Sequence, residues 1–378
     1  MKLLLITNAY PNKEKIYSNA FLHGRVKAYQ KYGHEVEVIV MSTKVAFDEE
    51  YDGVTIKYLD EYQIADYINH HSVDRILVHF VNKKIYTALK MMKNTPKVLI
   101  WFHGFEAEPW YARYYNFLVS KGSFLNHMKR KDSYYEETKE MLQGLIRNES
   151  IDKKFIYVSE SYKKKYVDPY LGIQPDSFYI ISNPIDPDIF TYNKKNAEDR
   201  FKICNIRPYT ARNYANDITR DVILGLSKKR YFNKLQFHLY GDGPLFNTIT
   251  EPLRKFDNVS INKGFVHQKD IVAIHKENGI YLGPTRHDSQ GVSLCEAMSS
   301  GLVPISNDIG AIAEFVNHAE NGLLAKRDDV KQMIDYIDYL VKNPDEFLRM
   351  SENASRMIIE KTGKEVIINK ELEVIESE

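Results

Sequence analysis

Cysteine is scarce in this chain: two residues, Cys204 and Cys295, among 378. Each lies within an apolar stretch, and their spacing is not that of a CxxC pair. A disulfide scaffold and a thiolate zinc site are therefore excluded, and two buried thiols are typical of a reducing compartment. We expect a cytoplasmic protein.

Long apolar runs are also missing. The first six residues are apolar, but Thr7 and Asn8 follow at once, which is too short for a signal peptide. No apolar run reaches the roughly 18 residues needed to cross a bilayer. We expect a soluble protein, at most peripheral to the inner face of a membrane. The basic runs 129–131 and 163–165 leave two interpretations, a solvated helix face or contact with anionic lipid or acceptor phosphate.

The chain has no surplus of either charge, with 52 Lys and Arg against 51 Asp and Glu. Such a balance provides no global attraction for nucleic acid, so an anionic ligand has to be held by local groups. Hydrophobic residues make up 43% of the sequence, enough to fill real cores. The length fits two α/β domains better than one.

Short apolar runs alternate with helical patterns along the whole chain, which predicts parallel sheets with crossover helices. The expected strands are 3–8, 36–40, 75–80, 98–103, 155–159, 179–183, 202–206, 235–240, 259–262, 279–282 and 303–306; helical patterns cover 21–32 and 84–92, and 110–151 holds two helices.

The alternation breaks at Asn183–Asp188, where two prolines within four residues favour a linker. We therefore expect an N-terminal Rossmann-like domain over 1–186 and a C-terminal one over 187–355. A helical segment, 356–378, is expected to pack back on the first domain. In tandem doubly wound domains, the carboxyl ends of both sheets face a cleft where ligands bind.

The most informative segment runs from Gly283 to Met298, leaving a strand through a polar loop into a helix. Backbone N–H groups at the start of that helix, from Gln290 to Ser293, are expected to receive phosphate or sugar oxygens. Asp288 and Glu296 are placed to hold two parts of one long ligand. The alternative is that Asp288 or Ser289 only caps the helix and that Glu296 is a surface residue of it.

This segment resembles the signature of the GT-B retaining glycosyltransferases of family 4 (glycosyl transferases group 1), in which two carboxylates are separated by seven residues. Ala297-Met298 and the Gly-x-x-Pro of 301–304 continue the resemblance. Further matches occur in family order at the segments Phe102–Gly104, Asn183–Asp186, Tyr240–Pro244 and Gly264–Val266. The resemblance implies an α/β chain of two Rossmann-like domains with doubly wound parallel sheets facing across a cleft.

The resemblance also implies roles for residues. Asp288 and His103 would act at the donor sugar as catalytic groups, and Glu296 would hold the ribose. The remaining donor contacts would come from Arg207, Arg212, Gly241, Gly243, Gln290, Gly291, Val292 and Ser293, and acceptor contacts from Trp110 and Tyr111. Asp186-Pro187-Asp188 resembles a metal motif of another transferase architecture but lies in the linker, so neither a metal nor a cofactor besides the donor is expected.

The expected function is transfer of a hexosyl unit from a nucleotide-diphosphate sugar, with UDP favoured, to a hydroxyl of a glycan, lipid-linked or protein acceptor. Anomeric configuration would be retained, and cell-envelope or capsular polysaccharide or glycoconjugate synthesis is the expected setting. Three departures from the family favour an alternative, a non-catalytic GT-B partner that stabilises another transferase. Asp288 replaces a Glu, Arg212 stands near a missing Lys, and the first loop, including Ser18 and Asn19, lacks a Gly-Gly pair. An epimerase or phosphorylase of similar architecture is a further alternative.

Overall fold

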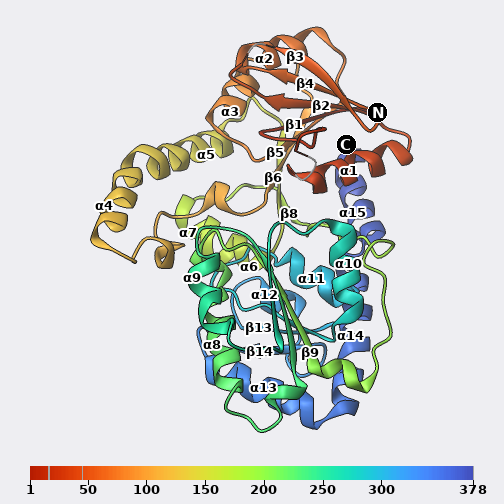
Figure 1. The fold of residues 1–378 in the computed structure, drawn as a ribbon. Helices are drawn as coiled ribbons and strands as arrows, with labels where there is room; N and C mark the ends of the chain where they lie inside the picture. Colours follow the sequence, from red (N-terminus) through yellow and green to blue (C-terminus); the bar gives the residue numbers. More distant parts are fainter. Residues whose placement is uncertain (16–17, 45, 378) are drawn as a thin grey trace. The chain divides into compact units, whose positions relative to one another are not determined.

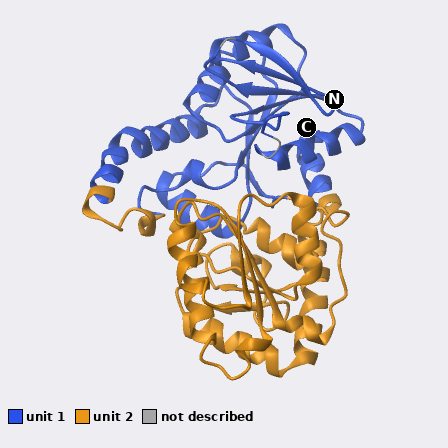
Figure 2. Cartoon of the chain, viewed as in Figure 1, with its two compact units in different colours: residues 1–112, 124–183, 367–378 blue, residues 113–123, 184–366 orange. Residues whose placement is uncertain are grey.

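The computed structural model describes residues 1–15, 18–44 and 46–377. The chain forms two compact units, coloured separately in Figure 2. Unit 1 contains residues 1–112, 124–183 and 367–378, and unit 2 contains 113–123 and 184–366. Each unit thus includes a short segment from the other half of the sequence. The main boundary lies between Asn183 and Pro184, within the segment expected to be a linker.

Unit 1 is built on an eight-stranded sheet in the order β3-β4-β2-β1-β5-β6-β7-β8, parallel except for the antiparallel pair β3–β4. Its strands are β1 (Lys2–Thr7), β2 (Glu35–Met41), β3 (Phe47–Tyr51), β4 (Val54–Leu59), β5 (Arg75–His79), β6 (Lys97–Phe102), β7 (Lys153–Tyr157) and β8 (Phe178–Ile180). The six strands expected in this half are confirmed with small shifts at their ends.

The hairpin β3–β4 was not predicted. Its first strand, Phe-Asp-Glu-Glu-Tyr, is acidic and mostly exposed, so it lacks the apolar run that marks the other strands. The turn between them is Asp52-Gly53, and both residues have positive φ, as a two-residue type I′ hairpin turn requires.

Helices cover both faces of the unit 1 sheet (Figure 1). One face packs with α2 (Glu61–His70), α3 (Lys83–Lys90), α5 (Glu137–Arg147) and α7 (Asp168–Leu171), and the other with α1 (Ala20–Lys31) and α15 (Lys364–Glu376). Alternate residues of β1 enter the two cores: Leu4 and Ile6 one, Leu3 and Leu5 the other. A strand buried on both faces reads as a continuous apolar run, which explains why these strands were predictable.

The C-terminal helix α15 belongs to unit 1, where Ile367, Ile368 and Leu372 share a core with the sheet. A buried ion pair fixes it, because Arg25 Nε of α1 donates to Glu371 Oε1 over 2.9 Å and both side chains are 0% exposed. The segment expected over 356–378 is therefore split. Residues 344–362 form α14 of unit 2, and α15 follows after Gly363.

Unit 2 contains a six-stranded, wholly parallel sheet in the order β11-β10-β9-β12-β13-β14. Its strands are β9 (Lys202–Ile206), β10 (Gln236–Gly241), β11 (Val259–Lys263), β12 (Ile280–Leu282), β13 (Val303–Asn307) and β14 (Leu323–Ala325). Five of them were predicted, and β14 was not. One face packs with α8 (Asn216–Leu226) and α13 (Val330–Lys342), the other with α10 (Gln268–Glu277), α11 (Val292–Ser299), α12 (Ile312–Phe315) and α14 (Pro344–Thr362).

The strand order of unit 2 reverses between β9 and β12, because the chain runs from β9 through β10 to β11 on one side before crossing to β12. Ligands of open α/β sheets bind at the carboxyl ends of the strands beside such a reversal. A ligand site is therefore expected at the loops that follow β9 and β12.

Candidate active site in the second unit

Arg207 follows β9 directly and is 5% exposed. Its Nη1 donates a 3.1 Å hydrogen bond to Ser293 Oγ, and its guanidinium lies 5.1 Å from the ring centre of Tyr214. Among the described residues, its Nε and Nη2 atoms have no hydrogen-bond acceptor. A buried cation with two unused donors is costly to the fold, so this arrangement suits an anionic ligand.

Asp288 lies in the loop after β12, beside Arg207. Its Oδ1 accepts the backbone N–H groups of Gln290 (3.2 Å) and Gly291 (2.7 Å), and its Oδ2 is 3.8 Å from Arg207 Nη2. These two contacts fix the loop before the helix. The alternative in which Asp288 caps α11 is wrong, because α11 begins at Val292 and, among the described residues, no side chain caps its first turn. The N–H of Gly291, expected to receive a phosphate oxygen, is already used by Asp288.

The start of α11 leaves other donors available. Gly291 is the N-cap residue, with φ 81°, and within the described chain no acceptor contacts the N–H groups of Val292 and Ser293. Helix N-termini with such free N–H groups attract anions. Ser293 Oγ also accepts a 3.1 Å hydrogen bond from the hydroxyl of Tyr281, a buried contact that sequence reasoning missed.

Glu296 lies one turn further into α11 and is half-buried. In the part of the chain that is described, no group donates a hydrogen bond to its carboxylate, and desolvation raises its pKa to about 8. At neutral pH the carboxyl group is therefore mostly protonated, and it can donate as well as accept hydrogen bonds from a hydroxyl-rich ligand.

Gly241 and Gly243 form a tight turn after β10, both with φ near +150°. A Cβ atom on Gly241 would lie 2.0 Å from the carbonyl oxygen of Arg207, and one on Gly243 would lie 2.4 Å from the carbonyl carbon of Tyr209. The close approach that these glycines permit is thus to the Arg207–Tyr209 backbone, which fixes Arg207. Their expected contact with a nucleotide stays a prediction.

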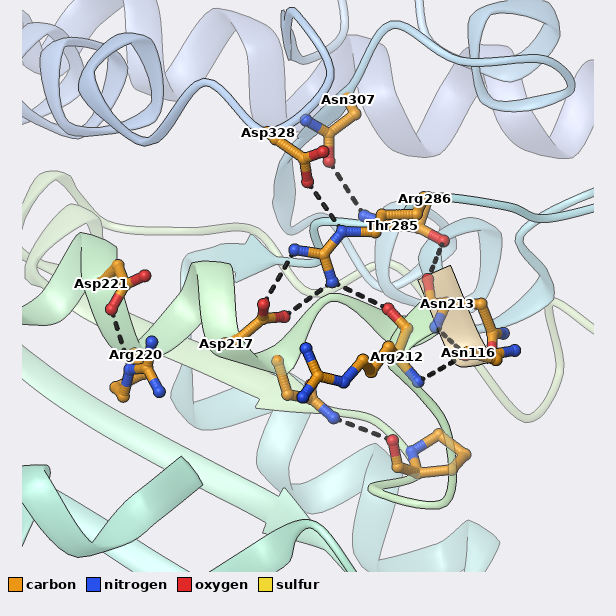
Figure 3. A network of polar contacts seen from close by, with 12 residues as sticks. Asn116, Arg212, Asn213, Asp217, Arg220, Asp221, Thr285, Arg286, Asn307 and Asp328 are labelled. Carbon is orange, nitrogen blue, oxygen red and sulfur yellow. Dashed lines mark hydrogen bonds and ion pairs between the residues drawn. The ribbon is translucent and has the colours of Figure 1, made fainter. Parts of the chain in front are cut away.

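Arg212 is exposed, and its guanidinium has no partner in the described regions of the chain. Its backbone, by contrast, is held on both sides (Figure 3), by Asn116 and Arg286. The free guanidinium agrees with the expected donor contact without testing it.

Arg286 has a structural role that the sequence analysis did not assign. Its guanidinium forms a bidentate pair with Asp217, both distances 2.8 Å, and Nε contacts Asp328 at 2.8 Å (Figure 3). Desolvation acts to raise the pKa of Asp217, but hydrogen bonds and the charge of Arg286 outweigh it and lower the pKa. Arg286 is therefore fully used within unit 2.

His103, the other expected catalytic residue, is in unit 1 at the end of β6. Its Nε2 lies 2.9 Å from His79 Nδ1, and its backbone N–H donates to the buried Glu106 over 3.0 Å. Desolvation and the charge of Arg25 hold the pKa of His103 well below its usual value, so the ring is neutral. Desolvation also raises the pKa of Glu106 to about 7.

The expected acceptor residues Trp110 and Tyr111 are also in unit 1. Their rings meet edge to face with centroids 5.7 Å apart, and Tyr111 is 53% exposed. The Trp110 carbonyl accepts a 2.7 Å hydrogen bond from His127 Nε2. Within unit 2, then, the structure brings Arg207, Asp288 and Ser293 together, whereas these two residues and His103 are in the other unit.

Comparison with known proteins identifies the second unit. Residues 222–357, which include α11, match the family model described as glycosyl transferases group 1. This part of the chain is similar to that family.

Two relatives and one solved structure extend the comparison beyond this segment. An uncharacterized glycosyltransferase of Haemophilus influenzae is 31% identical over 26% of the chain and 28% of its own length. An uncharacterized protein from the cps region of Klebsiella pneumoniae is 25% identical over 49% of the chain and 58% of its own length. The structure of Anabaena HepE in complex with UDP has a TM-score of 0.72 at 12% identity, covering 99% of both chains. The expected GT-B fold is thus confirmed.

The described residues contain neither a membrane-spanning helix nor a cluster of metal-ligating side chains. No helix there is both long and apolar enough to span a bilayer. Nor do His, Cys, Asp and Glu side chains gather in threes as a metal ion would need.

Proposed function

We propose that this chain is a glycosyltransferase that transfers a sugar from a nucleotide-diphosphate sugar, with UDP as the favoured nucleotide, to an acceptor hydroxyl. The observation that carries the proposal is the buried guanidinium of Arg207, which has two unused donors. It lies beside the free N–H groups of α11, at the strand-order reversal of a group 1 segment.

The proposed reaction depends on stabilising negative charge on the leaving group. When the sugar–phosphate bond breaks, negative charge develops on the departing diphosphate. Arg207, the free guanidinium of Arg212 and the N–H groups of Val292 and Ser293 are positive groups that stabilise such charge. In this scheme the departing phosphate takes the acceptor proton on the same face, which retains the anomeric configuration and needs no metal ion.

The remaining site residues take supporting roles. Asp288 has one oxygen, Oδ2, not used by the loop, and it is proposed to hold a sugar hydroxyl. The protonated Glu296 is suited to the ribose hydroxyls. Neutral His103 is proposed to accept a sugar hydroxyl, and the exposed face of Tyr111, next to Trp110, is proposed to stack on an acceptor sugar.

The proposed acceptor is a growing cell-envelope or capsular glycan. This is supported by the Klebsiella relative, whose name places it in a cps region.

The helical run 121–136 has no buried residue, exposes Leu125 and Tyr134, and carries four cations at positions 121 and 129–131. Such a segment suits peripheral contact with an anionic membrane. More of the protein should cosediment with phosphatidylglycerol vesicles than with phosphatidylcholine vesicles, and Leu125→Asp should abolish this difference. Equal binding of the wild type to both lipids would contradict the proposed membrane contact.

The first experiment is a thermal-shift panel of UDP-, GDP-, ADP-, CMP- and dTDP-sugars on the wild type and Glu296→Ala. A ligand at about 100 times its Kd adds roughly 2.7 kcal/mol of stability, which this assay detects. A shift with the UDP-sugars that Glu296→Ala loses supports the proposal, and sugar transfer from the same donor then tests turnover. Binding by none of the five at millimolar concentration favours the alternative, a non-catalytic partner of another transferase.

A further inference from the structure

Asn116 is joined to the loop that carries Arg212, although 96 positions separate the two residues in sequence. Its Oδ1 accepts the backbone N–H of Arg212 over 2.8 Å and that of Asn213 over 3.2 Å (Figure 3). Asn116 belongs to the segment 113–123, which lies in unit 2 although its chain neighbours on both sides lie in unit 1.

The carbonyl groups of the same two residues accept hydrogen bonds from residues of the loop after β12. Arg286 Nη1 donates to Arg212 O over 2.9 Å. Asn213 O accepts the backbone N–H of Arg286 (2.9 Å) and the hydroxyl of Thr285 (3.1 Å). All four backbone polar groups of Arg212 and Asn213 are therefore fixed, while the Arg212 guanidinium is left free.

A fixed backbone that carries a free guanidinium is the arrangement expected if these contacts position the Arg212 side chain for a ligand. A long side chain is presented at a defined place only if its backbone is rigid, because each loose torsion adds entropy that binding must remove. The carbonyl side is secured by Arg286, itself clamped by Asp217 and Asp328. On the N–H side, Asn116 Oδ1 is the acceptor for both groups.

We propose that Asn116 is a positioning residue for donor binding. Its amide oxygen holds the Arg212–Asn213 backbone so that the Arg212 guanidinium meets the donor diphosphate. This inference rests on the proposed function.

The test is a double-mutant cycle on the full chain, measuring UDP binding by calorimetry. If another nucleoside diphosphate gives the larger shift in the panel, it replaces UDP. Asn116→Leu keeps the size of the side chain and removes the acceptor, so we expect a Kd about tenfold weaker. Arg212→Ala should weaken binding by a similar factor, and the double variant should bind no more weakly than Arg212→Ala alone, because Asn116 acts through Arg212.

Asn82 provides a matched control. Its Oδ1 also accepts two backbone N–H groups, those of Lys84 (3.0 Å) and Ile85 (3.1 Å), but in unit 1 at the start of α3. Asn82→Leu should lower Tm about as much as Asn116→Leu and leave the Kd for UDP unchanged. Such a pair separates loss of stability from loss of positioning.

Three results overturn the inference. If Asn116→Leu lowers Tm but leaves the Kd unchanged, Asn116 is only structural. If the effects of Asn116→Leu and Arg212→Ala add fully, Asn116 does not act through Arg212. If the wild type binds no nucleoside diphosphate, the proposed function fails together with the inference, and this outcome is recognised because it precedes any substitution.

Discussion

Arg207 Nη1 donates a 3.1 Å hydrogen bond to Ser293 Oγ, so the cation that follows β9 is fixed to the first turn of α11. The buried guanidinium and the free N–H groups of the helix thus form one positively polarised surface. Two loops from opposite sides of the strand-order reversal supply it.

Replacing Arg207 by Met should remove ligand binding without unfolding the chain. A buried guanidinium with two unused donors costs stability, and an apolar side chain of similar length removes that cost. We expect Tm in the absence of ligand to stay equal or rise, and the Kd for UDP to weaken by about 10- to 100-fold, the value of one or two charge-assisted hydrogen bonds. Thermal unfolding and calorimetry measure the two effects. Arg220→Met, at an arginine whose Nε pairs with Asp221 over 2.8 Å, is the control and should leave the Kd unchanged. An equal loss of affinity in both variants would contradict a specific role for Arg207.

Glu296→Gln should change how stability depends on pH. Burial raises the pKa of Glu296 from 4.5 to about 8, so the folded chain holds a proton that the unfolded chain releases between these values. Its contribution is fully present below about pH 4.5 and is lost as pH rises through about 8. Gln stays neutral, so the Tm of the variant minus the Tm of the wild type should increase by a few degrees between pH 5 and pH 9. The exposed Glu277→Gln should track the wild type throughout. Parallel curves for Glu296→Gln and wild type would show that Glu296 is ionised in the fold.

Gly243→Ala should destabilise unit 2 more than Gly264→Ala. Both glycines have φ +145°, so the backbone strain of an alanine is the same in each. Only at Gly243 would the Cβ also meet protein, 2.4 Å from the carbonyl carbon of Tyr209; at Gly264 nothing lies within 4 Å. We expect about 1 kcal/mol for Gly264→Ala and at least about 2 kcal/mol more for Gly243→Ala, measured by urea unfolding followed by circular dichroism. Equal losses would mean that the Tyr209 loop moves away freely.

Glu371→Gln should destabilise unit 1 by about 3 kcal/mol or more, because it leaves the buried Arg25 without its counter-charge. Tyr29→Phe removes only the 2.7 Å hydrogen bond to Glu371 Oε2 and should cost about 1–2 kcal/mol. Both tryptophans of the chain, Trp101 and Trp110, lie in unit 1, so their fluorescence reports this unit alone. A Glu371→Gln fluorescence transition at the wild-type position would contradict the assignment of α15 to unit 1.

Eleven of the fourteen strands were predicted, because short apolar runs alternate with helical patterns along the chain. The exceptions are the exposed β3, its partner β4 and the three-residue β14. The Asp52-Gly53 turn was a usable signal for the β3–β4 hairpin, since that dipeptide between alternating runs is typical of type I′ turns.

The site was predictable only in part. The polar loop after β12 pointed to Asp288 and Glu296 because a local pattern of residue types marks a strand, a loop and a helix start. Which arginine is free and which is paired depends on contacts across the fold. Arg286 is neutralised by Asp217 and Asp328, 69 and 42 positions away, whereas Arg212 is not. Asn116 gave no signal, because its two contacts with the Arg212 loop span 96 and 97 positions.

The return of α15 to unit 1 affects the order in which the protein can fold during synthesis. All of residues 184–366 are synthesised before Ile367, Ile368 and Leu372. At typical rates of translation this takes roughly 10 to 40 s. Throughout that time one face of the first sheet is covered by α1 without α15, and Arg25 lacks Glu371. The first unit therefore cannot complete its core until this last helix has been made, although most of its residues are synthesised before those of unit 2.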